Sequence, residues 1–117
     1  MNEVMQNILT RRSTRKFTDQ PLPEDDLNQI VQAALHAPSG MGRQTWQFTV
    51  VKNREKIRKL AAAIAETLGR EGYDCYEPTV LLIPSNLKES PWGKEDNACA
   101  LENIFLAANS RESAPYG

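Results

Sequence analysis

The stretch Ala37–Phe48, APSGMGRQTWQF, separates two strongly patterned segments of the chain. Apolar periodicity predicts a helix before it and a strand after it, but the stretch itself has no periodicity. Gly40 and Gly42 permit backbone conformations and close approaches that other residues resist, while Arg43 and Gln44 supply hydrogen-bonding groups. This composition is typical either of an ordinary helix-to-strand loop or of one wall of a ligand site.

A second unusual segment lies near the N-terminus, where TRRSTRKF covers Thr10–Phe17. Four of the 14 Lys and Arg residues fall within Arg11–Lys16. Guanidinium groups make charge-assisted, bidentate hydrogen bonds to phosphate, and Arg residues on both sides of Ser13 can surround an anion. A solvated basic surface explains the run equally well. We interpret the two segments together as converging on one anionic, aromatic ligand.

The composition limits the classes of function that the chain can have. Its 117 residues suit one domain, and 40% hydrophobic with 25% charged residues is ordinary for a globular protein. A net charge of −1 gives no overall attraction to nucleic acid or to a membrane surface. No apolar run reaches the roughly 18 residues of a membrane helix, and no signal peptide is recognisable. Cys75 and Cys99 lack metal-binding spacing, so we expect reduced thiols, no metal site and a cytoplasmic location.

Apolar periodicity predicts four helices and two strands. The predicted helices cover Asn2–Leu9, Glu24–His36, Arg54–Leu68 and Glu95–Asn109, and the strands cover Gln47–Val51 and Thr79–Ile83. These elements indicate an α+β or α/β domain. Two strands make a marginal sheet, so we expect either a second copy to complete the sheet or part of the domain to be missing. The last helix is apolar around much of its circumference, which indicates burial on several sides and a subunit interface.

Several other single residues have ordinary explanations. Trp46 and Phe48 are expected in the core at the start of a strand, and His36 has no partner that suggests a catalytic triad. Glu95 and Asp96 begin a helix, where acids are usually dipole partners. The chain contains neither a GxGxxG nor a GxxxxGK[ST] motif.

Taken in order, RRSTRKF (Arg11–Phe17), APSG (Ala37–Gly40) and RQTWQF (Arg43–Phe48) resemble the N-terminal part of the nitroreductase-like flavoprotein family. LLIPSN (Leu81–Asn86) and EDNACALENIFLAANS (Glu95–Ser110) also resemble its smaller bacterial members.

The resemblance implies an α+β, nitroreductase-like three-layer fold with a small central sheet flanked by helices. Residues 1–110 are then the N-terminal part of an FMN-binding domain, and residues 111–117, RESAPYG, form an atypical tail. We expect this incomplete fold to be completed or stabilised in a homodimer with FMN at its interface.

The resemblance further implies an FMN-dependent oxidoreductase that takes electrons from NAD(P)H and reduces nitroaromatic or quinone-like small molecules by hydride transfer through flavin N5. The positions matching the segment that holds the FMN phosphate, ribityl chain and pyrimidine edge are Arg11, Arg12, Ser13 and Arg15. Those matching the loop that packs on the isoalloxazine from the other subunit are Pro38, Ser39 and Gly40, with Gln44 near the flavin. Because the flavin carries the chemistry, no catalytic side chain is expected.

Two departures from the family pattern bear on activity. Family members usually carry Asn where this chain has Gly42. The family also continues after its interface helix with a Gly-rich turn, further strands and basic residues that hold the phosphate, so the resemblance implies a member truncated or frameshifted after Ser110, with impaired activity. The alternative is a flavin-binding or assembly module without turnover. The near-zero net charge disfavours a third hypothesis, a plain anion- or nucleic-acid-binding domain.

Overall fold

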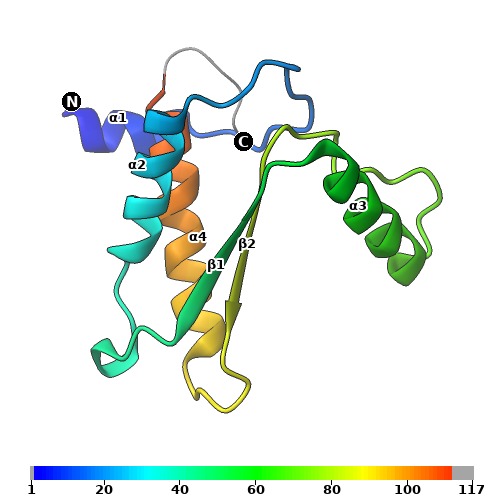
Figure 1. The fold of residues 1–117 in the computed structure, drawn as a ribbon. Helices are drawn as coiled ribbons and strands as arrows, with labels where there is room; N and C mark the ends of the chain where they lie inside the picture. Colours follow the sequence, from blue (N-terminus) through cyan, green and yellow to red (C-terminus); the bar gives the residue numbers. More distant parts are fainter. Residues whose placement is uncertain (1, 112–117) are drawn as a thin grey trace.

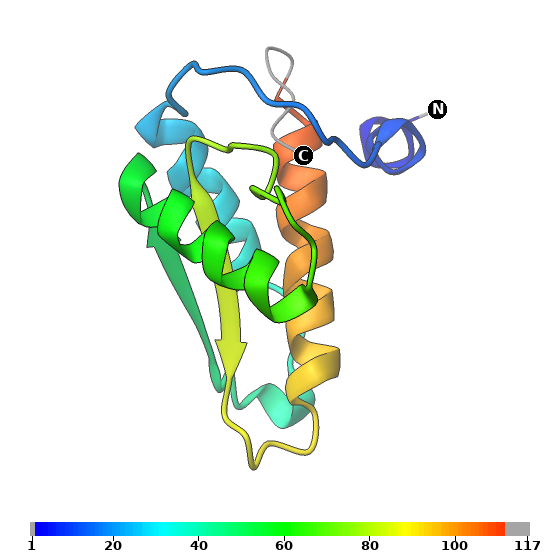
Figure 2. The ribbon, with the colours of Figure 1, turned by 90° about the vertical axis from the view of Figure 1, so that its right-hand side faces the viewer.

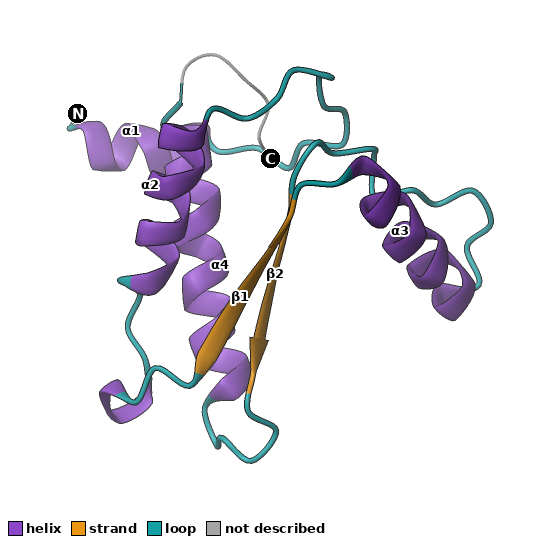
Figure 3. Cartoon of the chain, in the orientation of Figure 1, coloured by secondary structure: helices purple, strands orange, loops and turns teal. Residues whose placement is uncertain are grey.

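The computed structural model describes residues 2–111, so the expected tail lies, apart from Arg111, outside the described residues. The elements are α1 (Glu3–Thr10), α2 (Glu24–Leu35), the short 3₁₀ turn η1 (Gly40–Gly42), β1 (Trp46–Val51), α3 (Arg54–Leu68), β2 (Leu81–Asn86) and α4 (Gly93–Asn109). After α1, the helices α2, α3 and α4 are separated in the chain by the two strands, as Figures 1 and 3 show. The predicted mixture of helices with a small sheet is confirmed.

The two strands pair antiparallel, with Trp46 opposite Asn86 and Val51 opposite Leu81. β2 begins at Leu81, two residues later than the start of the predicted strand Thr79–Ile83, and continues beyond the predicted end through Pro84 to Asn86. Pro84 lies opposite Phe48. It cannot donate a backbone hydrogen bond, but each strand of a two-stranded sheet has a free edge, where such a loss is tolerated.

Helices α2 and α4 lie side by side on one face of this two-stranded sheet (Figures 1 and 2). The buried residues of α2 recur at helical spacing, as predicted: Leu27, Ile30 and Ala34. The small side chains of Ala34 and Ala100 are fully buried and let the two helices approach closely. Trp46 packs against them, which confirms it as a core residue, and Phe48 and Ile104 cover the cluster.

Helix α3 lies on the opposite side of the two-stranded sheet from α2 and α4 (Figures 1 and 2). Its bounds are those predicted. Asn53 caps the first turn by accepting a hydrogen bond from the Lys56 backbone N at 3.0 Å, and Gly69 ends the helix with a left-handed φ of 67°. Only Ile57 and Ala61 of α3 are buried. The rest of its predicted apolar stripe is exposed: Leu60, Ile64 and Leu68.

The chain is more open than a closed domain of its size. Its accessible surface is 8348 Å², whereas a closed protein of 13.1 kDa exposes about 6,400 Å². Its radius of gyration is 15.1 Å, against about 13 Å for a compact chain of this length. The apolar stripe of α1 is exposed, namely Val4, Met5, Ile8 and Leu9.

The predicted burial of α4 on several sides, with a subunit interface, stays a prediction, because a single copy covers the helix only in part. Only Asp96, Ala100 and Ala108 of α4 are buried, while Cys99 and Phe105 are exposed. Within the described residues, α4 is contacted by α2, by both strands and, near its C-terminal end, by α1. Within residues 2–111, no helix has the length and apolar character needed to cross a membrane.

Candidate functional site

The loop from Pro38 to Thr45, called the glycine loop below, joins α2 to β1 through strained backbone. Met41, Gly42 and Gln44 have φ values of 52°, 65° and 50°. The left-handed conformation costs a residue with a side chain about 1–2 kcal/mol, and strain of this kind concentrates at functional sites. A Cβ on Gly42 would meet nothing within 4 Å. Conformation, not space, therefore favours glycine there.

Gly40, in contrast, is restricted by space. A Cβ at this position would lie 2.4 to 2.6 Å from the indole atoms Cδ2, Cε3 and Cγ of Trp92. Trp92 immediately precedes α4 and is half-buried. Its ring therefore packs directly on the backbone of the glycine loop, and only glycine permits this contact.

Asp96, in the first turn of α4, has a role that its sequence context does not reveal. Its side chain is buried, with 5% of the residue exposed. Its Oδ1 accepts a hydrogen bond from the backbone N of Gly40 at 2.9 Å. The side chain thus holds the glycine loop in addition to lying near the positive end of its own helix dipole. The positive end of the α4 dipole lies on the same side as this bond, because Asp96 is in the first turn of the helix.

The other end of the glycine loop is held by a chain of amide and hydroxyl groups. The Thr45 hydroxyl donates to Asn86 Oδ1 at 2.6 Å, and Asn86 Nδ2 donates to Asn97 Oδ1 at 3.0 Å. Asn97 follows Asp96 on α4. The first turn of α4 thus contacts the loop directly at Gly40 and, through the end of β2, at Thr45.

The basic segment leaves α1 as an extended arm, residues 11–17, called the basic arm below. Arg11 Nε lies 3.8 Å from Glu102 Oε1 on α4. Arg12, Ser13, Arg15 and Lys16 are exposed. Within residues 2–111, neither Arg12, Arg15 nor Lys16 forms an ion pair. The arm therefore presents three cations available for an anion.

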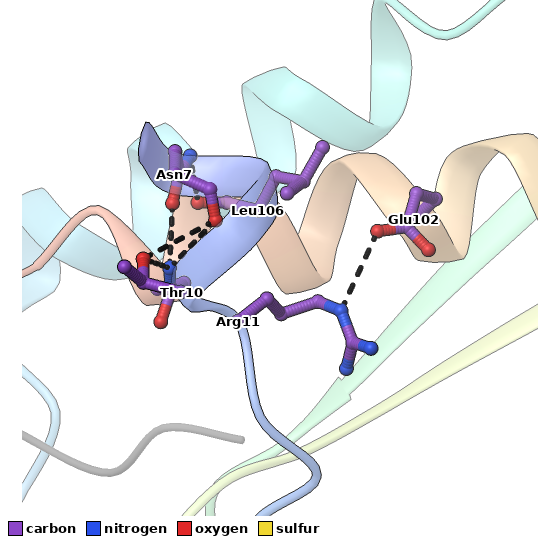
Figure 4. Close-up of polar contacts among 6 residues, drawn as sticks. Asn7, Thr10, Arg11, Glu102 and Leu106 are labelled. Carbon is purple, nitrogen blue, oxygen red and sulfur yellow. Dashed lines mark hydrogen bonds and ion pairs between the residues drawn. The ribbon is translucent and has the colours of Figure 1, made fainter. Parts of the chain in front are cut away.

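Polar contacts anchor the start of this arm on α4, as Figure 4 shows. Asn7 Nδ2 donates to the Leu106 carbonyl at 2.8 Å. Asn109 Nδ2 donates to Asn7 Oδ1 at 2.7 Å and to the Thr10 hydroxyl at 3.1 Å. These bonds fix the C-terminal end of α1 beside the last turns of α4.

One copy of the chain does not bring the two predicted segments together. The basic arm is held beside the second half of α4, at Glu102 and beyond, while the glycine loop is held at the first turn by Asp96. The arm lies before α2 and the loop after it, at opposite ends of that helix (Figure 1). The 12 residues of α2 span about 18 Å. Their convergence on one ligand remains a prediction that requires a second copy.

A largely apolar cavity of about 220 Å³ lies between the end of the basic arm, α2, the segment before β2, and α4. Phe17, Leu27, Leu82 and Phe105 are among the residues that line it. None of the eight predicted cofactor-binding residues lines this cavity.

Known proteins resemble this chain along most of its length. A protein of Archaeoglobus fulgidus with a provisional NADH dehydrogenase/NAD(P)H nitroreductase name is 34% identical over 110 residues, which cover 92% of this chain and 62% of that protein. A Bacillus subtilis protein named FMN reductase (NAD(P)H) is 33% identical over 96 residues, 82% of this chain and 37% of that protein. The chain thus spans less than two thirds of the length of these relatives.

Solved structures with a similar fold also resemble this chain. A Bacteroides fragilis nitroreductase solved with bound FMN superposes with a TM-score of 0.88 at 40% identity, over 94% of this chain and 66% of that one. The model of the nitroreductase family matches residues 8–112, which include the basic arm, the glycine loop and α4. The chain therefore belongs to the nitroreductase family.

Proposed function

We propose that the chain binds FMN and acts with NAD(P)H as an oxidoreductase of the nitroreductase type, in the cytoplasm. The observation that carries the proposal is its 40% identity, over 94% of its length, to a nitroreductase that holds FMN. The chemistry that FMN supplies when bound is hydride transfer from NAD(P)H to a nitroaromatic or quinone-like acceptor. The use of NAD(P)H as electron donor and of these acceptors is part of the same proposal.

The residues of the basic arm fit the phosphate of FMN. Arg12 and Arg15 are exposed, and neither forms an ion pair within the described residues. A phosphate can therefore bind them without breaking an existing ion pair. Arg11 differs because Glu102 already lies 3.8 Å away. We assign phosphate binding mainly to Arg12 and Arg15, with the Ser13 hydroxyl as an additional donor.

The glycine loop fits a flat ring system. Its backbone is fixed by Asp96 and Trp92, and Pro38 and Gln44 are exposed on it. Ser39 is turned inward, since its Oγ accepts a hydrogen bond from the Gln44 backbone N at 3.2 Å. We therefore assign contact with the ring to Pro38, Gly40 and Gln44, and the shape of the loop to Ser39.

The proposed site requires two copies of the chain. The basic arm and the glycine loop lie at opposite ends of α2 (Figure 1), so we propose that one FMN is held by the arm of one copy and the loop of the other. The exposed apolar stripe of α1 and the exposed Phe105 on α4 provide surface for such a homodimer. Light scattering on the purified chain measures its mass directly, and a monomer that binds FMN tightly contradicts a shared site.

The test of the proposed function begins with the colour of the purified protein. The unaltered chain is expected to carry flavin absorbance or to take it up from added FMN. The double variant Arg12→Ala/Arg15→Ala should bind FMN at least about 100-fold more weakly, about 10-fold for each charge-assisted contact. Arg58→Ala/Lys59→Ala, which removes two exposed cations from α3, is the matched control and should leave the affinity unchanged. A chain that takes up no FMN refutes the proposal.

A second candidate function is FMN binding without turnover. It is favoured by the assignments above, which give residues of the basic arm and of the glycine loop roles in holding FMN and give none of them a role in turnover. Anaerobic addition of NADPH or NADH to the FMN-loaded protein separates the two functions. Rapid bleaching of the flavin absorbance supports an oxidoreductase, whereas stable absorbance with bound FMN supports a binding module.

A further inference from the structure

We infer that Asp96 is a positioning residue for the cofactor, acting through the backbone of the glycine loop. The inference rests on the proposed FMN function, because it assigns Asp96 to the wall of that same site. Asp96 is the buried charged residue of the described part of the chain, with 5% of its surface exposed. Burial of a carboxylate is costly unless the charge is compensated by hydrogen bonds or a dipole.

The hydrogen bond that compensates the buried Asp96 side chain comes from the glycine loop. Its Oδ1 accepts from the Gly40 N–H at 2.9 Å across 56 positions of sequence. The neighbouring acid Glu95 shares the first turn of α4 but is exposed. Both acids interact favourably with the helix dipole, but only Asp96 also fixes the position of Gly40.

Gly40 has little freedom to move within the loop. Its Cα side already meets the indole ring of Trp92, while its N–H is held by Asp96. The loop residue is thus fixed from two directions by groups at the start of α4. Asn97, the next residue of α4, holds the far end of the loop through Asn86 and Thr45.

These contacts hold the loop in one conformation before FMN binds, so that binding itself has to order the loop less. The loop contains two residues with side chains in the left-handed conformation, Met41 and Gln44, so it relaxes if its anchors are removed. A ligand that needs the ordered loop then binds more weakly, in proportion to the fraction of molecules with an ordered loop. Removal of the Asp96 side chain is therefore expected to weaken FMN binding even in a variant that still folds.

The experiment compares three variants of the full chain. Asp96→Leu removes the acceptor and keeps a similar branched shape, Asp96→Asn retains an acceptor oxygen, and Glu95→Gln changes the charge of the same helical turn without touching the loop. We measure the FMN Kd by fluorescence quenching and hydrogen exchange of the Gly40 amide in the protein without FMN. Asp96→Leu should raise both the Kd and the exchange rate about 10-fold or more. Asp96→Asn should stay within about 3-fold of the unaltered chain, and Glu95→Gln should not change either value.

A purely structural role for Asp96 predicts a different result. In that case Asp96→Leu lowers the melting temperature, but the folded fraction binds FMN with unchanged Kd, and the positioning role is refuted. If Asp96→Leu does not fold, Asp96→Ala removes the same acceptor without adding a larger apolar side chain and should also raise the Kd about 10-fold. An unchanged Kd in that variant also refutes the inference.

The failure of the proposed function gives a separate signature. If the unaltered chain takes up no FMN, the cofactor role of Asp96 is refuted together with the proposed function. If the unaltered chain binds FMN and Asp96→Leu binds it equally well, only the positioning role is refuted. The exchange of the Gly40 amide, which needs no FMN, reports independently on whether Asp96 orders the loop.

Discussion

Substitution of Gly40 by Ala tests the contact between the glycine loop and α4 most directly. The added Cβ would lie 2.4 Å from Trp92 Cδ2 and 2.5 Å from Cε3, far inside normal contact. The φ of Gly40 is not in the left-handed region, so the cost is steric. Overpacking of this kind costs about 1–3 kcal/mol. Displacement of the loop also lengthens the bond to Asp96, which places the expected loss near the upper end of that range.

Urea unfolding followed by far-UV circular dichroism measures the free energy of unfolding without relying on tryptophan fluorescence. Gly93→Ala is the matched control, because its Cβ would lie 3.5 Å from Asn86 Cβ, an ordinary contact. It should change stability by less than about 0.5 kcal/mol.

A double-mutant cycle then identifies the steric partner of Gly40. In a Trp92→Ala background the indole ring is absent, so Gly40→Ala should cost at least about 1 kcal/mol less than it does in the unaltered chain. Equal costs in the two backgrounds, or a Gly40→Ala variant as stable as Gly93→Ala, would show that Trp92 does not restrict Gly40.

Three further outcomes are expected. Gly42→Asn should leave the urea midpoint nearly unchanged and keep or strengthen FMN binding, because φ is 65°, the site is open and Asn tolerates this conformation; a loss of more than about 1 kcal/mol contradicts this account. Gly69→Ala, at φ 67°, should cost about 1 kcal/mol and speed hydrogen exchange within α3 more than within α4, whereas uniform acceleration would show that α3 does not open on its own. Ile8→Glu on the exposed stripe of α1 should shift the mass measured by light scattering from dimer to monomer, and an unchanged dimer excludes α1 from the interface.

The helices were predictable because the information that defines them is local. Leu27, Ile30 and Ala34 recur at helical spacing, and Asn53 and Gly69 bound α3 with their own side chain and backbone preferences. The position of β2 was less predictable, since strand limits depend on the partner strand. Pro84 argued against a strand until its pairing with Phe48 in a two-stranded sheet was known.

The candidate site was predictable in composition but not in its anchoring. Gly40 and Gly42 both suggested close approach of the backbone to another group, but only Gly40 has such a neighbour, and Gly42 serves a left-handed turn. An acid in the first turn of a helix has the same sequence context whether it faces water or holds a distant loop. The hydrogen bond between Asp96 and Gly40 therefore had no signal in the sequence.

The proposed site, shared between two copies, has a genetic consequence. In a two-fold symmetric dimer, each site takes its arm from one copy and its loop from the other. A chain with a defective arm and a chain with a defective loop then form a mixed dimer in which one site carries both defects and the other carries neither. Two alleles that are each inactive alone restore function together, whereas two alleles altered at Gly40 and at Asp96 do not complement each other, because both impair the same loop.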